Sequence, residues 1–240
     1  MKTLTIIPSR LSATRLPGKP LLKINNLSII SHVFKRAQEA NIGEVFVATE
    51  DQEIVEDVTK NGGSAILTSK SHKTGSDRIF EALQKLNIKG VDLIMNLQGD
   101  EPIIDIKDII NLNKKMIKNQ SEMGTLASTI KDLKNENIVK VITKKKLNED
   151  QFSEAEIFLR NASNVDNIYN HIGIYCYSIE TLDRFVKLSQ SQNEIKFRLE
   201  QLRALDNNIK INVALANSSP IGVDTEEDYI ALKKIMEYKA

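Results

Sequence analysis

The sequence has a single cysteine, Cys176, among its 240 residues, and no tryptophan. One cysteine cannot form a disulfide within the chain, and three scattered histidines provide no cluster with the spacing of a zinc site. The composition therefore excludes a disulfide-stabilised fold and gives no sign of a structural zinc centre. We expect a protein of the reducing cytoplasm.

Charge of one sign is not in excess either, since 33 Lys and Arg residues stand against 32 Asp and Glu residues. A general nucleic-acid-binding protein usually has a strong basic excess, so nucleic acid is not an expected partner. Long apolar runs are also missing. The first apolar stretch ends at Pro8, and no later run approaches the ~18 residues that span a bilayer. We therefore expect neither a signal peptide nor a membrane segment.

Two familiar phosphate-binding motifs are absent from the sequence. A Walker loop requires a glycine where Ala13 stands and a Ser or Thr where Pro20 follows Gly18 and Lys19. A Rossmann dinucleotide motif requires two glycines separated by one residue, and no pair of glycines has that spacing. These absences exclude a P-loop kinase and a dinucleotide-dependent dehydrogenase.

The first half of the sequence alternates between short apolar runs and amphipathic segments. This pattern predicts strands at 4–8, 44–49, 64–67 and 92–97, a helix capped by Ser28, and further helices at 51–60, 76–86 and 106–117. Strands that alternate with helices are typical of an α/β fold with a mostly parallel sheet. A chain of this length can bury roughly 70% of its unfolded surface in a core.

From Met123 the pattern changes to extended segments at 125–130, 139–143, 156–159 and 171–177. Helices at 179–188 and 194–205, a strand at 210–216 and a closing helix from about 226 are expected to follow, the last capped by Asp224 or Thr225. We interpret the chain as one domain, with a core at about 1–122 and 206–240 and a small mixed lobe inserted at about 123–205.

The loop after the first strand, residues 8–20, sets three cations among prolines and small residues. A solvated surface turn is one interpretation, because such residues favour turns. The other is a phosphate cradle, in which backbone N–H groups of small residues approach an anion and Arg10, Arg15 and Lys19 supply positive charge. Ligands of open α/β sheets bind beyond the carboxyl ends of the strands, where this loop begins.

Further candidates lie at element ends. Asp100 follows the strand at 92–97, either as a turn residue or as a carboxylate at the ligand edge, and Asp224 is a helix cap, a second such carboxylate, or both, since the two roles are not exclusive. His171 and Tyr175 share one side of their strand, whereas Cys176 is expected in the core. Glu200 and Gln201 lie on a charged helix, where a solvated face is the ordinary interpretation, and His72 lies in a polar turn.

Several motifs, in this order along the chain, resemble those of the nucleotide-sugar cytidylyltransferases. The loop motif begins with Pro-Ser-Arg at 8–10 and ends with Thr-Arg-Leu-Pro-Gly-Lys-Pro at 14–20. The further matches are Val-Ala-Thr at 47–49, Thr-Gly-Ser-Asp-Arg at 74–78, Asn-Leu-Gln-Gly-Asp-Glu-Pro at 96–102, Val-Lys-Val at 139–141, His-Ile-Gly-Ile-Tyr at 171–175, Leu-Glu-Gln-Leu-Arg at 199–203 and Gly-Val-Asp-Thr at 222–225. Within the family the chain most resembles the enzymes that activate 3-deoxy-manno-octulosonate (Kdo).

The resemblance implies a Rossmann-like nucleotidyltransferase sheet and a reaction in which CTP and Kdo give a CMP-sugar and pyrophosphate, for lipopolysaccharide biosynthesis. A related 2-keto-3-deoxy sugar acid, 8-amino-Kdo or one of sialic acid type, stays open as the alternative substrate. A homodimer built mainly from the inserted lobe is also implied. Two departures concern the sugar: the segment between Arg160 and His171 is shorter than in the family, and Phe197 replaces a glutamate.

The family's site residues are carried to this sequence by its motifs. Catalysis is implied for Arg10, Lys19 and Asp100, and Mg²⁺ coordination for Asp100 and Asp224. CTP binding is implied for Pro8, Arg10, Ser12, Ala13, Thr14, Arg15, Lys19, Thr74, Gly75, Ser76 and Arg78. Sugar binding is implied for Gln98, Arg160, His171, Tyr175, Glu200 and Gln201.

Overall fold

The computed structural model describes residues 1–12, 15–130, 132–162 and 165–237, which fold into two compact units. The N-terminal unit contains residues 2–91, 96–106 and the chain from 220 onward, and the central unit contains residue 1 and residues 92–95 and 107–219. The chain therefore leaves the N-terminal unit and returns to it twice.

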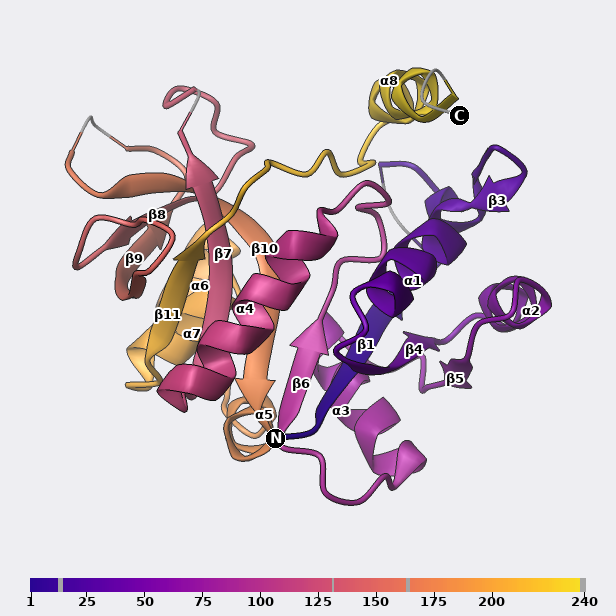
Figure 1. The fold of residues 1–240 in the computed structure, drawn as a ribbon, viewed down its shortest axis with the longest axis horizontal. Helices are drawn as coiled ribbons and strands as arrows, with labels where there is room; N and C mark the ends of the chain where they lie inside the picture. The colour runs from indigo at the N-terminus through magenta and orange to yellow at the C-terminus, as the bar shows by residue number, and fades with distance from the viewer. Residues whose placement is uncertain (13–14, 131, 163–164, 238–240) are drawn as a thin grey trace. The chain divides into compact units, whose positions relative to one another are not determined.

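Three parallel strands form the sheet of the N-terminal unit. β4 (Gly43–Thr49) lies between β1 (Thr3–Ser9) and β5 (Ala65–Leu67), and β1 pairs with β4 from Thr3 opposite Gly43 to Ser9 opposite Thr49. The connections are α1 (Ile29–Glu39), α2 (Gln52–Lys60) and α3 (Gly75–Leu86). Figure 1 shows α1 in front of β1 and α3 behind it. The predicted parallel α/β arrangement is confirmed here.

Local signals explain where these helices begin. Ser28 accepts the N–H of Ser31 at the start of α1, as a capping side chain does, and the helix buries an apolar stripe formed by Ile29, Ile30, Val33, Phe34 and Ala37. Thr74 accepts the N–H of Asp77 in the same way at the start of α3. In α1, therefore, the cap and the buried apolar face both lie where the sequence predicted them.

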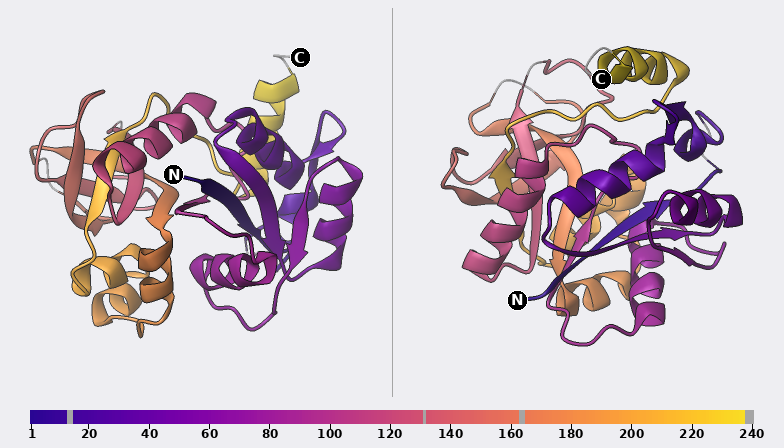
Figure 2. Two further views of the ribbon diagram at one scale, coloured as in Figure 1. Left: turned by 60° about the horizontal axis from the view of Figure 1, so that its bottom comes forward. Right: turned by 45° about the vertical axis from the view of Figure 1, so that its right-hand side comes forward.

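The ends of the N-terminal unit pack on a small hairpin. A short 3₁₀ helix, η1 (Lys19–Leu21), leads into β2 (Lys23–Ile24) and β3 (Leu27–Ser28), and the C-terminal helix α8 (Glu226–Glu237) packs beside them. Ile24, Ile29, Val223 and Leu232 form a buried cluster. Figure 2 shows α8, in yellow, next to the indigo hairpin segment.

The central unit has a mixed sheet. Its strands are β6 (Leu93–Asn96), β7 (Met123–Thr129), β8 (Lys140–Thr143), β9 (Phe152–Leu159), β10 (Ile168–Ser178) and β11 (Ile211–Leu215), in the order β6-β10-β7-β11-β9-β8. β7 and β11 are parallel, whereas β10 is antiparallel to β7 and also to β8. The pairing of β8 with both β9 and β10 closes these strands on themselves. A mixed sheet was predicted here. The unit also includes 107–122 and β11, which the sequence analysis placed in the core, because β11 pairs with β7.

Four helices cover this sheet: α4 (Ile106–Asn119), α5 (Ile179–Val186), α6 (Gln192–Phe197) and α7 (Gln201–Asp206). In Figure 1, α4 lies in front of β7, and α6 and α7 lie behind the strands. The prediction of one helix over 194–205 is wrong. Arg198 has a left-handed backbone, φ 54° and ψ 48°, which ends the hydrogen-bond ladder of α6.

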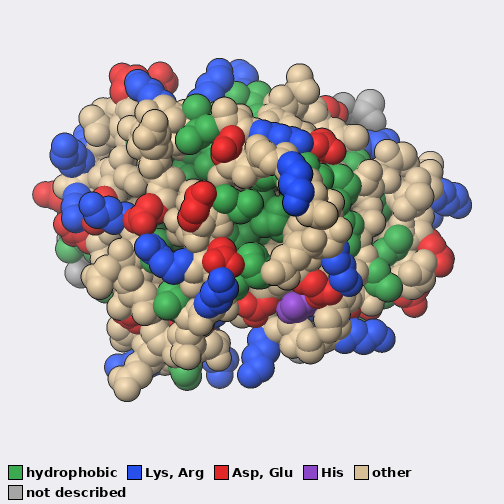
Figure 3. Space-filling view, turned by 90° about the horizontal axis from the view of Figure 1, so that it is seen from below, with side chains coloured by type: hydrophobic (Ala, Val, Ile, Leu, Met, Phe, Trp, Pro, Cys, Tyr) green, Lys and Arg blue, Asp and Glu red, His purple; other side chains and the backbone are tan. Residues whose placement is uncertain are grey.

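Cys176 on β10 is fully buried in the core, as expected, and burial raises the pKa of its thiol far above the usual value. No helix among the described residues is long and apolar enough to cross a bilayer. Figure 3 shows basic and acidic side chains interspersed over one face, in agreement with the balanced composition.

Candidate active site

The loop that follows β1 is closed at its base by backbone hydrogen bonds. The Gly18 N–H donates to the Leu11 carbonyl over 3.0 Å, and Gly18 has a left-handed backbone, φ 73°, which favours glycine. The Gly18 N–H is therefore used within the loop. Ala13 and Thr14, two predicted CTP-binding residues, lie outside the described residues.

Lys19 joins this loop to both predicted Mg²⁺ ligands. Its Nζ lies 2.5 Å from Asp100 Oδ2 and 3.3 Å from Asp224 Oδ1, and it donates to the Val223 carbonyl over 2.9 Å. Arg15 Nη2 lies 2.9 Å from the same Asp224 oxygen. Two predicted phosphate-binding cations and the two predicted metal-binding aspartates thus form one cluster within the N-terminal unit.

Backbone contacts hold the two aspartates at this place. The Val223 N–H donates to the Asp100 carbonyl over 2.9 Å, which ties the segment before α8 to the segment after β6. Gly99 allows the close approach, because a Cβ at this position would lie 2.9 Å from the Pro8 carbonyl oxygen. A larger residue at 99 would therefore push Asp100 away from the loop after β1.

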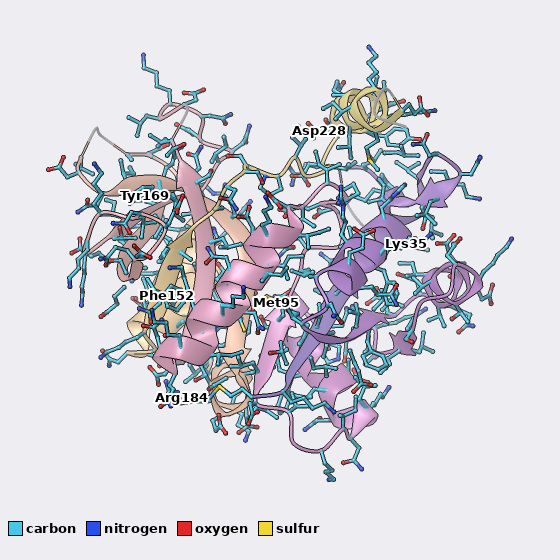
Figure 4. All side chains as sticks on the ribbon, viewed as in Figure 1. Lys35, Met95, Phe152, Tyr169, Arg184 and Asp228 are labelled. Atoms are coloured by element: carbon cyan, nitrogen blue, oxygen red, sulfur yellow. The ribbon has the colours of Figure 1, made fainter. Side chains whose placement is uncertain are left out.

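The structure decides between the two interpretations of Asp224. Thr225 Oγ1 accepts the N–H of Asp228, and the Asp228 carboxylate accepts the N–H groups of Thr225 and Asp224. Thr225 therefore caps α8, with Asp228 reaching back in the manner of a capping box. Figure 4 labels Asp228 at the start of this helix. The Asp224 carboxylate contacts Lys19 and Arg15 instead of capping the helix.

Glu101, next to Asp100, is a carboxyl group that the sequence analysis did not consider. Its Oε2 is buried and has no hydrogen-bond partner within the part of the chain that the structure describes. Burial, together with the negative charges of Asp100 and Asp224, raises the pKa of Glu101 to about 8. The Glu101 carboxyl is therefore held mainly in its neutral form at neutral pH, beside the two aspartates.

A cavity of about 370 Å³ opens at the cluster. Ten of the predicted site residues line it: Pro8, Arg10, Arg15, Lys19, Thr74, Gly75, Arg78, Gln98, Asp100 and Asp224. Gln98, which was expected to contact the sugar, lies in this same cavity. Ser12 and Ser76 are not among its lining residues: Ser12 is exposed, and Ser76 is a buried residue of the first turn of α3.

His72 also lines the cavity, although its polar turn favoured a solvated side chain. Its Nε2 pairs with the Glu81 carboxylate on α3, and Glu81 accepts the Ser69 N–H as well. The one feature of the sequence that could have indicated His72 as a cavity residue is its position two residues before Thr74, a predicted CTP-binding residue. His72 lines the cavity because α3 packs against the turn that carries it, through Glu81. This packing is a tertiary contact that the local sequence does not indicate.

Arg78 is buried and its guanidinium is held by three groups. Nη1 donates to Thr68 Oγ1 over 2.6 Å and to the Ser69 carbonyl over 3.4 Å, and Nη2 pairs with the Glu50 carboxylate. A desolvated guanidinium with a carboxylate partner is well fixed in place. Arg78 therefore forms a rigid part of the cavity wall.

The predicted sugar-binding residues His171 and Tyr175 lie in a row of aromatic rings in the central unit. His171 is 5.0 Å from the Phe158 ring and 5.4 Å from the Tyr175 ring, and the row continues to Tyr177 and Phe185. The pairing of β10 with β7 shifts register between Ile172 and Tyr175. The two rings stay in contact across this irregularity, on the shared side that strand alternation predicts.

His171 is a neutral imidazole. Burial lowers its pKa to about 3. The Thr125 hydroxyl lies 2.7 Å from the Ile174 carbonyl and donates to it, so the contact of 3.0 Å with His171 Nε2 requires that nitrogen to carry the proton. His171 therefore has an unprotonated Nδ1, which is a hydrogen-bond acceptor.

Arg160 lies just beyond β9, where the sequence predicted it. Its Nη1 donates to the carbonyls of Glu136 and Asn137 over 3.3 Å each, and its own carbonyl accepts from the fully buried Lys140 ammonium over 2.7 Å. Lys140 also donates to the Asn135 carbonyl over 2.5 Å. The backbone at Arg160 is thus anchored by a buried cation.

Glu200 and Gln201 lie at the start of α7, beside a buried ion pair. Arg203 donates from Nε and Nη2 to the two carboxylate oxygens of Glu194, over 2.8 and 2.6 Å, and its Nη2 lies 3.7 Å from Glu200 Oε1. The Arg203 guanidinium also lies 4.8 Å from the Phe185 ring centroid. The helix end that carries both residues is fixed by these contacts.

The donor set of Asp100 and Asp224 fits Mg²⁺. Both carboxylates approach one point, because the single ammonium of Lys19 contacts both. No cluster of three or more His, Cys, Asp or Glu side chains suited to a metal occurs among the described residues. Mg²⁺ commonly takes one or two carboxylates and completes its shell with water and substrate phosphates. Two aspartates beside phosphate-binding cations match that pattern.

The chain is similar to known proteins over nearly its whole length. A family described as Cytidylyltransferase matches residues 4–211. A protein of Thermodesulfovibrio yellowstonii named 3-deoxy-manno-octulosonate cytidylyltransferase is 42% identical, with 98% of each chain covered. One of the same name from Afipia carboxidovorans is 42% identical, covering 99% of this chain and 98% of its own.

Solved structures are similar as well. A structure of CMP:2-keto-3-deoxy-manno-octonic acid synthetase complexed with CTP matches with a TM-score of 0.91 and 32% identity, and the match covers 100% of both chains. A UDP-glucose pyrophosphorylase complexed with UDP-glucose matches with a TM-score of 0.76 and 16% identity. The second likeness concerns the fold alone.

Proposed function

Since the chain belongs to the cytidylyltransferase family, we propose that it forms CMP-Kdo and pyrophosphate from CTP and 3-deoxy-D-manno-octulosonate. The observation that carries the proposal is the cavity in which Lys19 and Arg15 meet Asp100 and Asp224. This arrangement places cations for a polyphosphate beside carboxylates for its metal ion. The relatives named for Kdo favour this sugar over 8-amino-Kdo or a sialic acid.

The reaction is a nucleotidyl transfer in one displacement. The anomeric hydroxyl oxygen of the sugar forms a bond to the α-phosphorus of CTP, the bond from this phosphorus to the β-bridging oxygen breaks, and pyrophosphate leaves. The hydroxyl proton is released. In this scheme Arg10, Arg15 and Lys19 bind the triphosphate and offset the charge that develops on the leaving pyrophosphate. No covalent bond to the enzyme is needed.

Mg²⁺ is the cofactor in this proposal, held by Asp100 and Asp224. When bound, Mg²⁺ supplies a Lewis acid that polarises phosphate oxygens and helps gather the reacting groups. Lys19 contacts both carboxylates. When nucleotide and metal bind together, the Lys19 ammonium can therefore exchange part of its pairing with the aspartates for contacts with phosphate oxygens.

Nucleotide binding is assigned to the cavity walls. Pro8, Ser12, Ala13 and Thr14 belong to the loop segment, and Thr74, Gly75, Ser76 and Arg78 belong to the wall at the start of α3. Because the Arg78 guanidinium is held by Glu50, Thr68 and Ser69, we expect it to act as a rigid wall beside the cytosine base. CTP is the expected substrate, and purine nucleotides are expected to be inactive.

Sugar binding is assigned to Arg160, His171, Tyr175, Glu200, Gln201 and Gln98. Arg160 suits the sugar carboxylate, because a guanidinium binds a carboxylate with two parallel hydrogen bonds. His171 Nδ1 suits a sugar hydroxyl as a neutral acceptor, and Glu200 and Gln201 suit further hydroxyls. The stacked rings at His171 and Tyr175 offer an apolar wall for a sugar face.

The proposal extends to assembly and location. We propose a homodimer built mainly from the inserted lobe, and a cytoplasmic role in lipopolysaccharide biosynthesis, in which an activated Kdo is a substrate for glycosyl transfer. Light scattering at micromolar concentration tests the dimer. A particle of about 27 kDa, the mass of one chain, would contradict it.

One assay tests the reaction itself. Pyrophosphate release is measured with CTP, UTP, ATP and GTP, each with Kdo, 8-amino-Kdo and a sialic acid, in the presence of Mg²⁺. The expected result is turnover with CTP and Kdo, weak turnover with UTP, and none with ATP or GTP. Equal turnover with ATP would contradict the nucleotide assignment, and a preference for another sugar acid would contradict the Kdo assignment.

A further inference from the structure

Asp51 stands at the start of α2 but does not cap that helix. It occupies the N-cap position, φ −106° and ψ 120°, and its side chain makes no hydrogen bond to the first turn. An N-cap aspartate normally accepts a backbone N–H of its own helix, as Ser28 and Thr74 do in this unit. The Asp51 carboxylate therefore does not make the capping hydrogen bond that would stabilise the start of α2.

Its carboxylate is used on another segment, 40 positions earlier in the chain. Asp51 Oδ2 accepts the Leu11 N–H over 2.7 Å. Leu11 is the residue whose carbonyl accepts the Gly18 N–H and so closes the base of the phosphate-binding loop. Both backbone groups of Leu11 are thus held, one by the loop and the other by Asp51.

Asp51 is itself fixed by regular structure. Its N–H donates to Thr49 Oγ1 over 3.1 Å, and its carbonyl accepts from Ile54, the first bond of α2. Thr49 is the last residue of β4 and pairs with Ser9, the last residue of β1. The hydrogen bond from Leu11 to Asp51 therefore continues the contact between β1 and β4 beyond their last paired residues. Thr49 and the first turn of α2 hold Asp51 in place for it.

The charge of Asp51 makes a role as an anion contact untenable. A carboxylate repels a triphosphate, and Asp51 is not among the residues that line the cavity, so the role of its carboxylate follows from the group that it holds. A hydrogen bond from a backbone N–H to a carboxylate is about twice as strong as one between neutral groups. Arg10 immediately precedes Leu11, and Lys19 immediately follows Gly18, so both cations emerge from the closed base of the loop.

We propose that Asp51 is a positioning residue for CTP binding: it holds the Leu11 N–H and thereby keeps Arg10 and Lys19 directed to the triphosphate. The proposal rests on the proposed use of CTP. Asp51 does not touch the nucleotide in this role. Its effect is expected on the affinity for CTP and on the order of the loop base, and not on the affinity for the sugar.

Two substitutions separate the possible roles of Asp51. Asp51→Asn keeps an acceptor oxygen at the same distance and removes the charge. Asp51→Ser can cap α2, which restores the unmade helix contact, but its hydroxyl is one bond too short to reach Leu11. Ser178→Ala, which removes the cap of α5 in the central unit, is the control for a lost cap that has no link to the loop.

The test combines calorimetric titration of CTP with Mg²⁺, thermal unfolding, and trypsin cleavage after Arg10 and Arg15 followed by mass spectrometry. For Asp51→Ser we expect about tenfold weaker CTP binding, faster cleavage at both bonds, and an unfolding temperature close to that of the wild type. For Asp51→Asn, which keeps a weaker neutral hydrogen bond to Leu11, we expect a loss of CTP affinity clearly smaller than that of Asp51→Ser. For Ser178→Ala we expect a lower unfolding temperature with unchanged CTP binding.

Three outcomes would overturn the proposal. If Asp51→Ser binds CTP and is cleaved like the wild type, Asp51 does not position the loop. If Asp51→Asn loses as much affinity as Asp51→Ser, the charge matters and the hydrogen bond does not. If Asp51→Ser unfolds at a much lower temperature, Asp51 is a stability residue. Failure of the wild type to bind CTP would instead overturn the proposed function, and the cleavage rates without nucleotide would still report on the loop.

Discussion

Lys19 Nζ lies 2.5 Å from Asp100 Oδ2, although 81 positions separate the two residues. The contact brings the loop after β1 to the segment 97–102, and both side chains are largely shielded from solvent. A lysine that already contacts the two proposed metal-binding aspartates joins the two halves of the proposed chemistry, because it can respond to the binding of both phosphate and metal.

The two aspartates are the first target for mutation. Asp100→Asn and Asp224→Asn are each expected to reduce kcat by about 10² or more, because an amide stabilises a cation and the transition-state charge less well than a carboxylate. Pyrophosphate release at limiting and saturating Mg²⁺ is the measurement, with circular dichroism to show that each variant folds. Near-normal activity at limiting Mg²⁺ would show that the residue is not a ligand.

Thr225→Ala is the matched control for Asp224, because Thr225 is the residue that caps α8. Loss of this cap is expected to lower the free energy of unfolding by about 1 kcal/mol. The dependence of activity on Mg²⁺ is expected to stay unchanged. A Mg²⁺ dependence altered as strongly as in Asp224→Asn would show that Asp224 acts through the helix start.

Arg160 is expected to bind the sugar carboxylate. Arg160→Lys should lower kcat/KM for the sugar acid by roughly 1.5–3 kcal/mol in free energy, since a lysine cannot form two parallel hydrogen bonds to one carboxylate. The KM for CTP should hardly change. Arg184→Lys, at an exposed ion pair with Glu122, serves as the control. An equal loss in the use of CTP would place the carboxylate contact elsewhere.

His171 makes stability depend on pH. Its pKa is about 3 in the folded chain and about 6.5 when unfolded, so the unfolded chain binds more protons between these values. The contribution of neutral His171 to the free energy of unfolding should therefore be complete above pH ~6.5 and should decrease as the pH is lowered toward 3. Urea unfolding at pH 7.5 and 5.0 measures this. His171→Gln should show a smaller decrease, and an unchanged decrease would assign the effect to other groups.

The buried pair of Arg203 and Glu194 is expected to support the start of α7, which carries Glu200. Glu194→Gln leaves an uncompensated buried guanidinium and should lower the free energy of unfolding by about 3–5 kcal/mol. Asp183→Asn, which breaks an exposed pair with Lys187, should cost about 1 kcal/mol or less. Urea unfolding of both variants is the comparison. Equal losses would mean that burial does not set the strength of the Arg203 pair.

Local signals were sufficient for much of the fold. The apolar stripe from Ile29 to Ala37 and the cap at Ser28 predicted α1, and the short runs before the loop and before Thr49 predicted β1 and β4. These predictions succeeded because periodicity and capping depend on residues within one or two turns of each other. The same logic failed at Arg198, where an apolar pattern continued through a backbone that had already left the helix.

The motifs from Pro8 to Asp224, by their order and spacing, were enough to identify the cytidylyltransferase family and to name the side chains proposed for the chemistry. The contacts that these side chains make depend on the folded chain. Thr225 caps α8, and the Asp224 carboxylate contacts Lys19. His72 lines the cavity, and the Asp51 carboxylate accepts the Leu11 N–H instead of capping α2. Each of these choices joins segments distant in the chain, and strand register and packing, which no local pattern records, bring such segments together.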